Sequence, residues 1–207
     1  MTTTILIESL RKAKVVPVVR MQNSDHARTA VYWLREAGLK IFEITMTIPG
    51  AHQLIAELSS ESDLIVGAGT VPDAEAAAAC LAAGASFIVA PWIDPSLTKP
   101  CQAAGAALLL GAATPSEVRQ ALAAGADVVK IFPASSVGGP PHIKALASVF
   151  PGVPFCPTGG IGFSDIQKYL DAGSAFVGMG GSLVDEALVA ANNKAAIVAA
   201  AHQIIAL

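Results

Sequence analysis

The stretch Leu122-Ala-Ala-Gly-Ala-Asp-Val-Val-Lys-Ile-Phe-Pro133 contains the unit from which the fold can be predicted. An alanine-rich segment ends in Ala124-Gly125, and a run of apolar residues follows at once. Glycine after a helix supplies the positive φ that ends it. A continuous apolar run, in place of an alternating one, indicates a strand buried on both faces. The stretch therefore predicts a helix, a glycine turn and one strand of a parallel sheet.

The same unit recurs along the chain. The other Ala-Gly pairs that precede apolar runs are Ala37-Gly38, Ala83-Gly84, Ala104-Gly105 and Ala172-Gly173. A repeat of about 20 to 25 residues suits parallel strands joined by crossover helices. The apolar runs predict strands near residues 15–19, 40–46, 64–67, 86–90, 107–110, 127–132, 154–157 and 175–179.

Eight such units predict a single (β/α)8 barrel domain, the TIM barrel fold, over residues 1–207. One further helix is expected before the first strand and one after the last. Helix starts are predicted at Thr114-Pro115-Ser116-Glu117, at Asp94-Pro95 and at Ser24-Asp25. An open doubly wound sheet is the alternative, but no GxGxxG motif follows the first strand.

The composition argues against several classes of protein. Hydrophobic residues make up 53% of the chain, so disorder is not expected. The net charge is −3 without any basic run, which argues against a nucleic-acid partner. The uncharged segment 76–93 is long enough to suggest a membrane helix, but Gly84, Ser86 and Pro91 interrupt it. We therefore expect no membrane association.

The cysteines and histidines give no sign of a cofactor site. Cys80, Cys101 and Cys156 are widely spaced and odd in number, which predicts reduced thiols in a cytoplasmic protein. The N-terminal segment lacks a charged region followed by an apolar run, so a signal peptide is not predicted. The four histidines have no ligand spacing, and we expect neither a metal nor another cofactor.

Two charged residues stand inside apolar strands, where lysine and glutamate are rarely found without a partner. Lys130 lies between Val129 and Ile131, and Glu43 lies between Phe42 and Ile44. They belong to the sixth and second predicted strands, and alternate strands of a barrel build the same interior layers. A buried structural ion pair is one interpretation. The other is a catalytic pair, because desolvation disfavours the ammonium form of lysine and frees the amine for nucleophilic attack.

Glycine clusters follow the last two predicted strands, at Pro157-Thr158-Gly159-Gly160-Ile161 and at Gly178-Met-Gly-Gly-Ser182, and the second is expected to open the last helix. Convergent backbone N–H groups and a helix N-terminus favour anions, and phosphate sites in these barrels lie at these two loops. Two tight turns without a ligand are the alternative. Thr70 and Arg20 end the third and first strands, where each either binds a substrate anion or is only structural.

The sequence at this point resembles the 2-keto-3-deoxy-6-phosphogluconate (KDPG) and 4-hydroxy-2-oxoglutarate (KHG) aldolases. The motifs that carry the resemblance are Phe-Glu-Ile-Thr (42–45), Gly-Ala-Gly-Thr-Val (67–71), Lys-Ile-Phe-Pro-Ala (130–134), Lys-Ala-Leu (144–146), Cys-Pro-Thr-Gly-Gly-Ile (156–161) and Gly-Gly-Ser (180–182). They occur in the family's order, and the resemblance extends from about Val15 to Val184.

The resemblance implies a metal-free, homotrimeric class I aldolase that splits a 2-keto-3-deoxy sugar-acid phosphate into pyruvate and glyceraldehyde 3-phosphate. It assigns Lys130 as the Schiff-base lysine and Glu43 as the general acid/base. It places Thr70, Pro91 and Phe132 around the pyruvyl end of the substrate. The residues implied at the phosphate are Thr158, Gly159, Gly160, Gly181 and Ser182.

One position departs from the family's pattern. KDPG aldolases often have an arginine four residues after the catalytic glutamate, and this chain has Thr47 there. The segment 47–49 resembles the enzymes that act on the galactonate-derived epimer, whereas the segment 156–160 resembles the gluconate type. Both epimers therefore stay open, and Arg20 is the candidate for the carboxylate. A phosphate-binding barrel isomerase and a non-catalytic sugar-phosphate binding protein are the two alternative functions.

Overall fold

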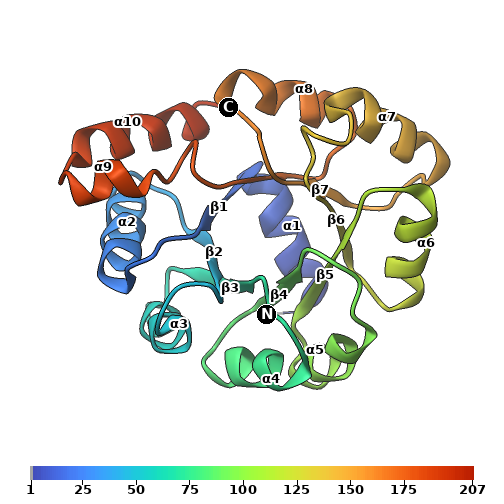
Figure 1. Ribbon diagram of the computed structural model, residues 1–207, viewed down its shortest axis with the longest axis horizontal. Coiled ribbons are helices and arrows are strands. Elements are labelled where there is room, and N and C mark those ends of the chain that lie inside the picture. Colours follow the sequence, from blue (N-terminus) through green and yellow to red (C-terminus); the bar gives the residue numbers. More distant parts are fainter. Residues whose placement is uncertain (1) are drawn as a thin grey trace.

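The computed structural model describes residues 2–207, and eight parallel strands form its central barrel (Figure 1). All eight predicted strands are present, and their ends differ from the predicted ones by at most two residues. The strands are β1 Val15–Val19, β2 Ile41–Thr45, β3 Ile65–Gly69, β4 Phe87–Ala90, β5 Ala107–Ala112, β6 Val128–Ile131, β7 Phe155–Pro157 and β8 Val177–Met179.

The strands are hydrogen-bonded in the order β7-β6-β5-β4-β3-β2-β1-β8. Isolated parallel bridges join Phe155 to Ser174 and Thr158 to Gly178, so the segments of β7 and β8 meet and close the ring. Closure leaves no sheet edge of the kind that an open doubly wound sheet has. The prediction of a TIM barrel is confirmed, and the doubly wound alternative is wrong.

Helices surround the barrel, and one more lies across its N-terminal end (Figure 1). The outer helices are α2 Ser24–Glu36, α3 Ala51–Ser59, α4 Ala74–Ala82, α5 Thr98–Ala104, α6 Pro115–Ala123, α7 Gly139–Val149, α8 Ile166–Asp171, α9 Glu186–Ala190 and α10 Lys194–Ile205, with short 3-10 helices at Pro95–Leu97 and Phe163–Asp165. The additional helix is α1, Thr3–Ala13. Its Leu6 and Leu10 are buried in one cluster with Val16, Phe87 and Val128, which lie at or next to the start of their strands. Because α1 fills this end, the opposite end is left for a site.

Most of the predicted helix starts and ends are found in the structure. Gly125 has φ 88° directly after α6, and the other four glycines of the repeated unit also have positive φ. Thr114 and Glu117 form the predicted capping box, and Asp94 caps the 3-10 helix that follows it. The predicted start of α2 is wrong by one residue. The cap is Asn23, whose side-chain oxygen accepts from the backbone N–H of Asp25 and of His26.

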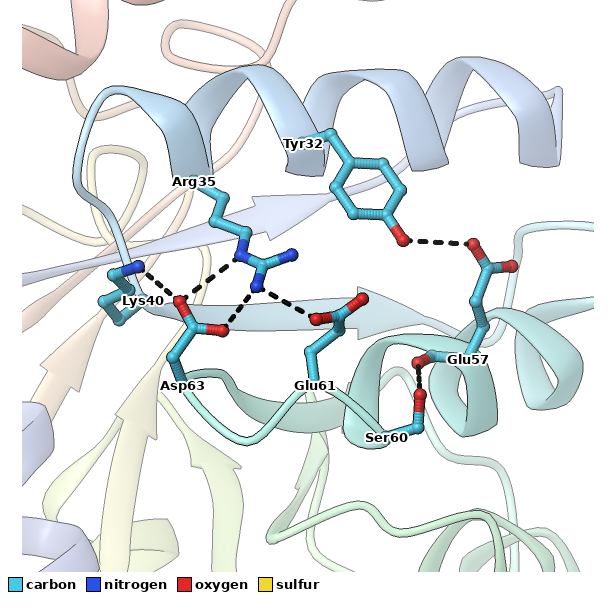
Figure 2. Close-up of polar contacts among 7 residues, drawn as sticks. All are labelled: Tyr32, Arg35, Lys40, Glu57, Ser60, Glu61 and Asp63. Carbon is cyan, nitrogen blue, oxygen red and sulfur yellow. Dashed lines mark hydrogen bonds and ion pairs between the residues drawn. The ribbon is translucent and has the colours of Figure 1, made fainter.

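Ion pairs connect α2 and the residue before β2 to the loop that follows α3 (Figure 2). Arg35 of α2 contacts Asp63 at 2.6 Å and Glu61 at 2.9 Å, in the loop that follows α3. Lys40, directly before β2, also binds Asp63, and these hydrogen bonds from Lys40 and Arg35 lower the pKa of Asp63 to about 2. The network thus ties α2 and the start of β2 to the chain that enters β3.

The apolar segment 76–93 folds as the sequence indicates. It contributes most of α4, a turn at Gly84 and the whole of β4. Among residues 2–207, none of the helices combines the length and the apolar character that a bilayer crossing requires.

Candidate active site

Lys130 and Glu43 meet inside the barrel. Lys130 projects from β6 and is 3% exposed, and Glu43 projects from β2 and is 4% exposed. The Lys130 Nζ atom lies 3.3 Å from Glu43 Oε1. β2 and β6 are far apart in the strand order, so the contact spans the interior. The prediction that the two side chains share an interior layer is confirmed, and a buried ammonium or amine is thereby placed next to a carboxylate.

Aromatic and sulfur-containing side chains complete the surroundings of the lysine. The Nζ atom of Lys130 lies 5.8 Å from the centre of the Phe132 ring, within the range of a cation–π contact. Cys156 is the neighbour of Lys130 in the register of β6 and β7. Burial raises the pKa of the Cys156 thiol to about 12, although the nearby Lys130 acts in the opposite direction. The thiol is therefore neutral near pH 7 and is a poor nucleophile.

Two threonine hydroxyls follow Glu43 at the C-terminal end of β2. Thr45 shares the inward face of β2 with Glu43 and is fully buried, and its hydroxyl lies 2.8 Å from that of Thr47. Thr47 is exposed just beyond the end of β2, at the position where the family often has arginine. Thr47 stands out in the sequence as a departure, but its hydrogen bond could not be predicted, because the turn after β2 decides where the two hydroxyls point.

A cavity of about 500 Å³ opens at the C-terminal end of the barrel. It brings together seven residues that the sequence singled out, namely Arg20, Phe132, Thr158, Gly159, Gly160, Gly181 and Ser182. Ile161, Gly178 and Gly180, which belong to the same glycine-rich segments, also line it, and Val18 and Gly162 are the lining residues that the sequence did not indicate. The glycine loops after β7 and β8 thus form one wall of a single cavity, as their positions on adjacent strands indicated.

The loop after β7 is a tight turn built on two glycines. Gly159 and Gly160 have φ 98° and 69°, a region that residues with a side chain rarely adopt. A Cβ atom at Gly160 would lie 1.9 Å from Ser135 Oγ, so the backbone also passes too close to its neighbour for any other residue. Thr158 is buried at the start of this loop, with its side chain against Gly178 of β8.

The loop after β8 differs from the prediction. The segment 178–182 does not open a helix, because the N–H groups of Leu183 and Val184 both donate to the carbonyl of Gly180 and form a turn. α9 begins only at Glu186. The Ser182 hydroxyl donates to the Ile161 carbonyl at 2.7 Å and so ties the two glycine loops together. A phosphate here would be held by turn N–H groups and hydroxyls, without a helix N-terminus.

The remaining predicted residues, Arg20, Thr70 and Pro91, directly follow the ends of β1, β3 and β4. Arg20 is exposed directly after β1, and its Nη2 atom donates to Thr70 Oγ1 at 3.1 Å. Thr70 has φ 54°, which turns the chain sharply after β3. Pro91 follows β4 and lines a second cavity of about 180 Å³ together with Trp92 and Phe132. Phe132 lines both cavities and therefore forms the wall between them.

Residues 2–207 contain no group of three or more histidine, cysteine, aspartate or glutamate side chains placed to hold a metal ion. The three cysteines are free and buried. The chemical groups that converge at this end of the barrel are thus an amine, a carboxylate, hydroxyls and backbone N–H groups. They suit nucleophilic attack on a carbonyl compound that carries an anionic group.

Comparison with known proteins agrees with this geometry. The sequence matches the family described as KDPG and KHG aldolase over residues 6–200. It is 37% identical to the 2-dehydro-3-deoxy-phosphogluconate aldolase of Haemophilus influenzae over 93% of this chain and 91% of that protein. The structure matches KDPG aldolase from Legionella pneumophila with a TM-score of 0.87 and 31% identity, covering 96% of this chain and 97% of that one.

The Legionella pneumophila structure holds pyruvate captured at low pH as a covalent carbinolamine intermediate. A native KDPGal structure is also similar, with a TM-score of 0.79 and 31% identity over 93% of this chain and 96% of that one. These relatives decide against the isomerase and the non-catalytic binding protein as alternatives. With its barrel, its buried lysine and these relatives over nearly its whole length, the chain belongs to the KDPG and KHG aldolase family and is an aldolase, a lyase.

Proposed function

We propose that the protein cleaves KDPG or its galactonate-derived epimer to pyruvate and glyceraldehyde 3-phosphate through a Schiff base on Lys130. The observation that carries the proposal is the 3.3 Å contact between the buried Lys130 amine and the Glu43 carboxylate, beside a cavity lined by glycine loops. An isolated buried pair of this kind contributes little to stability, because desolvation offsets the attraction. A catalytic role accounts for its presence better than a structural one.

The reaction starts when the neutral Lys130 amine attacks the C2 ketone of the substrate. The carbinolamine that forms loses water and becomes an iminium ion, which can accept electrons from a neighbouring bond. Glu43 removes the proton of the C4 hydroxyl, directly or through a water molecule. The C3–C4 bond then breaks, its electron pair passes into the iminium, and glyceraldehyde 3-phosphate leaves. Acid–base assistance of this kind contributes about 10²- to 10⁴-fold to a rate.

The second half of the reaction releases pyruvate. After cleavage, an enamine of pyruvate remains on Lys130. Protonation of its terminal carbon, with Glu43 as the proton donor, restores the iminium. Addition of water to that iminium and loss of the amine give pyruvate and the free lysine. Each proton that the carboxylate accepts in the first half is thus returned in the second.

The substrate's two anionic groups are assigned to different groups of residues. The 500 Å³ cavity, with Thr158, Gly159, Gly160, Gly181 and Ser182 in its lining, is the proposed phosphate site. Thr70, Pro91 and Phe132 are proposed to surround the pyruvyl end. Arg20 lines the cavity and also contacts Thr70, so its guanidinium lies between the proposed phosphate site and a residue proposed for the pyruvyl end. It is our candidate for the charged contact with the substrate carboxylate, because Thr47 carries no positive charge.

Membership of the family supports a homotrimer, and the free buried cysteines suit a reducing compartment such as the cytoplasm. Sedimentation velocity of the purified protein measures the first of these proposals directly. A monomer at working concentration would contradict it.

Cleavage assays on the two C4 epimers, run side by side, test the proposed activity. Pyruvate formation is followed with each epimer at matched concentrations. Cleavage of at least one epimer is expected, and the ratio of kcat/KM values gives the preference. Absence of cleavage of both, by a folded protein, would contradict the proposed substrates.

A further inference from the structure

Two of the three residues that β3 turns toward the barrel interior are glycines, and Ile65 at the start of the strand is the third. Gly67 and Gly69 are two residues apart and therefore share a face of the strand. A Cβ atom at Gly67 would lie 2.1 Å from Phe87 Cε2, and one at Gly69 would lie 2.1 Å from Glu43 Oε1. Side chains from the two neighbouring strands thus occupy the space that residues at these positions would fill.

Backbone conformation does not explain the glycine at position 69. Gly69 is absent from the residues with positive φ, and an alanine would adopt its backbone without strain. Gly69 also pairs with Thr45 in the register of β2 and β3, and its carbonyl accepts from the N–H of Met46 at 2.7 Å. The strand that carries Glu43 and the backbone of Gly69 are therefore fixed to each other. Glycine is needed at position 69 because a side chain there would fill the space that Glu43 occupies.

The occupant of that space is the acidic end of Glu43. A Cβ atom at Gly69 would lie 2.7 Å from Glu43 Cγ and 2.8 Å from Cδ, in addition to its contact with Oε1. Distances this short do not occur between real side chains, so the whole carboxyl group would have to move. Because Glu43 is only 4% exposed, it cannot relocate into solvent without leaving the interior. Its 3.3 Å contact with Lys130 would be lost.

We propose that Gly69 is a positioning residue, whose missing side chain forms the slot that holds the Glu43 carboxylate beside the Lys130 amine. The proposal rests on the proposed function, in which Lys130 forms the Schiff base and Glu43 transfers protons. Gly67 makes room for a different side chain. The ring of Phe87 fills the space beside Gly67 and belongs to the same cluster as Leu6 and Leu10 of α1. On the inner face of β3, the space beside Gly67 thus holds the Phe87 ring, and the space beside Gly69 holds the Glu43 carboxylate.

The substitution Gly69→Ala tests the slot through kinetics. A displacement of about 1 Å in a catalytic group can lower a rate about 100-fold. We expect a fall in kcat of this size with KM little changed, since the phosphate cavity is untouched. Exchange of the methyl protons of pyruvate in deuterated water should fall in parallel. Trapping of pyruvate on Lys130 by borohydride should persist, because the amine itself remains in place.

A double-mutant cycle on thermal unfolding tests the same contact without any reference to activity. Gly69→Ala should lower Tm by at least about 2–4 °C in the wild-type background. In the Glu43→Ala background the colliding carboxyl group is absent, and Gly69→Ala should then change Tm by less than about 1 °C. If Gly69→Ala alone does not fold, we expect the double variant to fold. An equal loss in both backgrounds, or failure of both to fold, would overturn the slot.

Gly152→Ala is the matched control. Gly152 has φ 84°, and nothing lies within 4 Å of the position of its Cβ atom, so alanine there introduces backbone strain without a collision. It lies between α7 and β7, at the end of the barrel away from the cavity. Gly152→Ala should lower Tm and leave kcat and proton exchange unchanged. A fall in exchange equal to that of Gly69→Ala would show that general destabilisation is the cause.

Two controls separate failure of the proposed function from failure of the proposed role of Gly69. If borohydride and pyruvate do not label Lys130 in the wild type, or Glu43→Gln leaves exchange unchanged, the proposed function fails. If those two results hold but Gly69→Ala exchanges protons at the wild-type rate, only the slot is overturned.

Discussion

The Lys130 Nζ atom lies 3.3 Å from Glu43 Oε1, and the two residues are 3% and 4% exposed. They are separated by 87 positions in the chain, and their strands, β2 and β6, lie on opposite sides of the barrel. A carboxylate at this distance is placed to transfer protons to and from a substrate attached to the amine. Substitution of either residue should therefore change a different step of the reaction.

Lys130→Met should abolish both labelling and cleavage. Borohydride reduction in the presence of pyruvate should add one pyruvyl group to the wild-type protein, and peptide mapping should place it on Lys130. The variant should take no label and give no measurable cleavage. Removal of one partner of a buried pair costs about 3–5 kcal/mol, so we also expect a lower Tm.

Lys144 is the control for this experiment, because it is exposed on α7. Lys144→Met should keep its activity and its label. Label on another lysine of the wild type, or activity in Lys130→Met, would refute the assignment.

Glu43→Gln should separate imine formation from proton transfer. The amide keeps the shape of the side chain but cannot act as a base. The variant should still be trapped by pyruvate and borohydride, and cleavage should fall by about 10²- to 10⁴-fold. Exchange of pyruvate methyl protons, followed by NMR in deuterated water, should fall with it. An exchange rate like that of the wild type would mean that another group is the base.

Ser182→Ala should weaken the binding of phosphorylated substrate. In the structure the Ser182 hydroxyl donates to the Ile161 carbonyl, so it must turn toward a phosphate in order to donate to it. Loss of one hydrogen bond to a charged group costs about 1.5–3 kcal/mol, and the effect should appear mainly in KM. A 4-hydroxy-2-oxo acid without phosphate is the matched substrate and should show little penalty. Equal penalties on both substrates would argue against a phosphate role.

The cysteines should resist alkylation in the native protein. Burial raises the pKa of Cys80 to about 11 and that of Cys101 and Cys156 to about 12. At pH 8 almost no thiolate is present, and the thiolate is the form that reacts with iodoacetamide. Mass spectrometry should find no adduct on the folded chain and three after unfolding in denaturant. Rapid modification of Cys156 in the native protein would show that reagents enter the barrel interior.

The strands could be predicted because each depends on a short run of sequence. The five Ala-Gly pairs end helices, since only glycine adopts their positive φ readily, and apolar runs such as 128–131 need burial on both faces. Lys130 and Glu43 were visible as candidates for a related reason. A charged residue in the middle of such a run conflicts with its surroundings in any fold that buries the run.

Local signals were less reliable where two of them competed. Asn23, and not Ser24 or Asp25, caps α2, because its side chain reaches the first free N–H groups of the helix. The segment 178–182 looked like a helix start and is a turn, because the carbonyl of Gly180 accepts from both Leu183 and Val184. Neither outcome can be read from residue preferences alone, since several residues in each segment suit the position.

The sequence by itself therefore determined the eight repeated units, the closed barrel that they favour and the two charged residues that do not fit an apolar strand. These follow from backbone conformation and from the periodicity of burial, which act over a few residues. Only the tertiary structure decided which groups meet: Glu43 with Lys130, Glu43 with the open space beside Gly69, and Arg20 with Thr70. The first contact depends on closure of the barrel, which brings β2 and β6 face to face, and the other two depend on the side-by-side order of β1, β2 and β3.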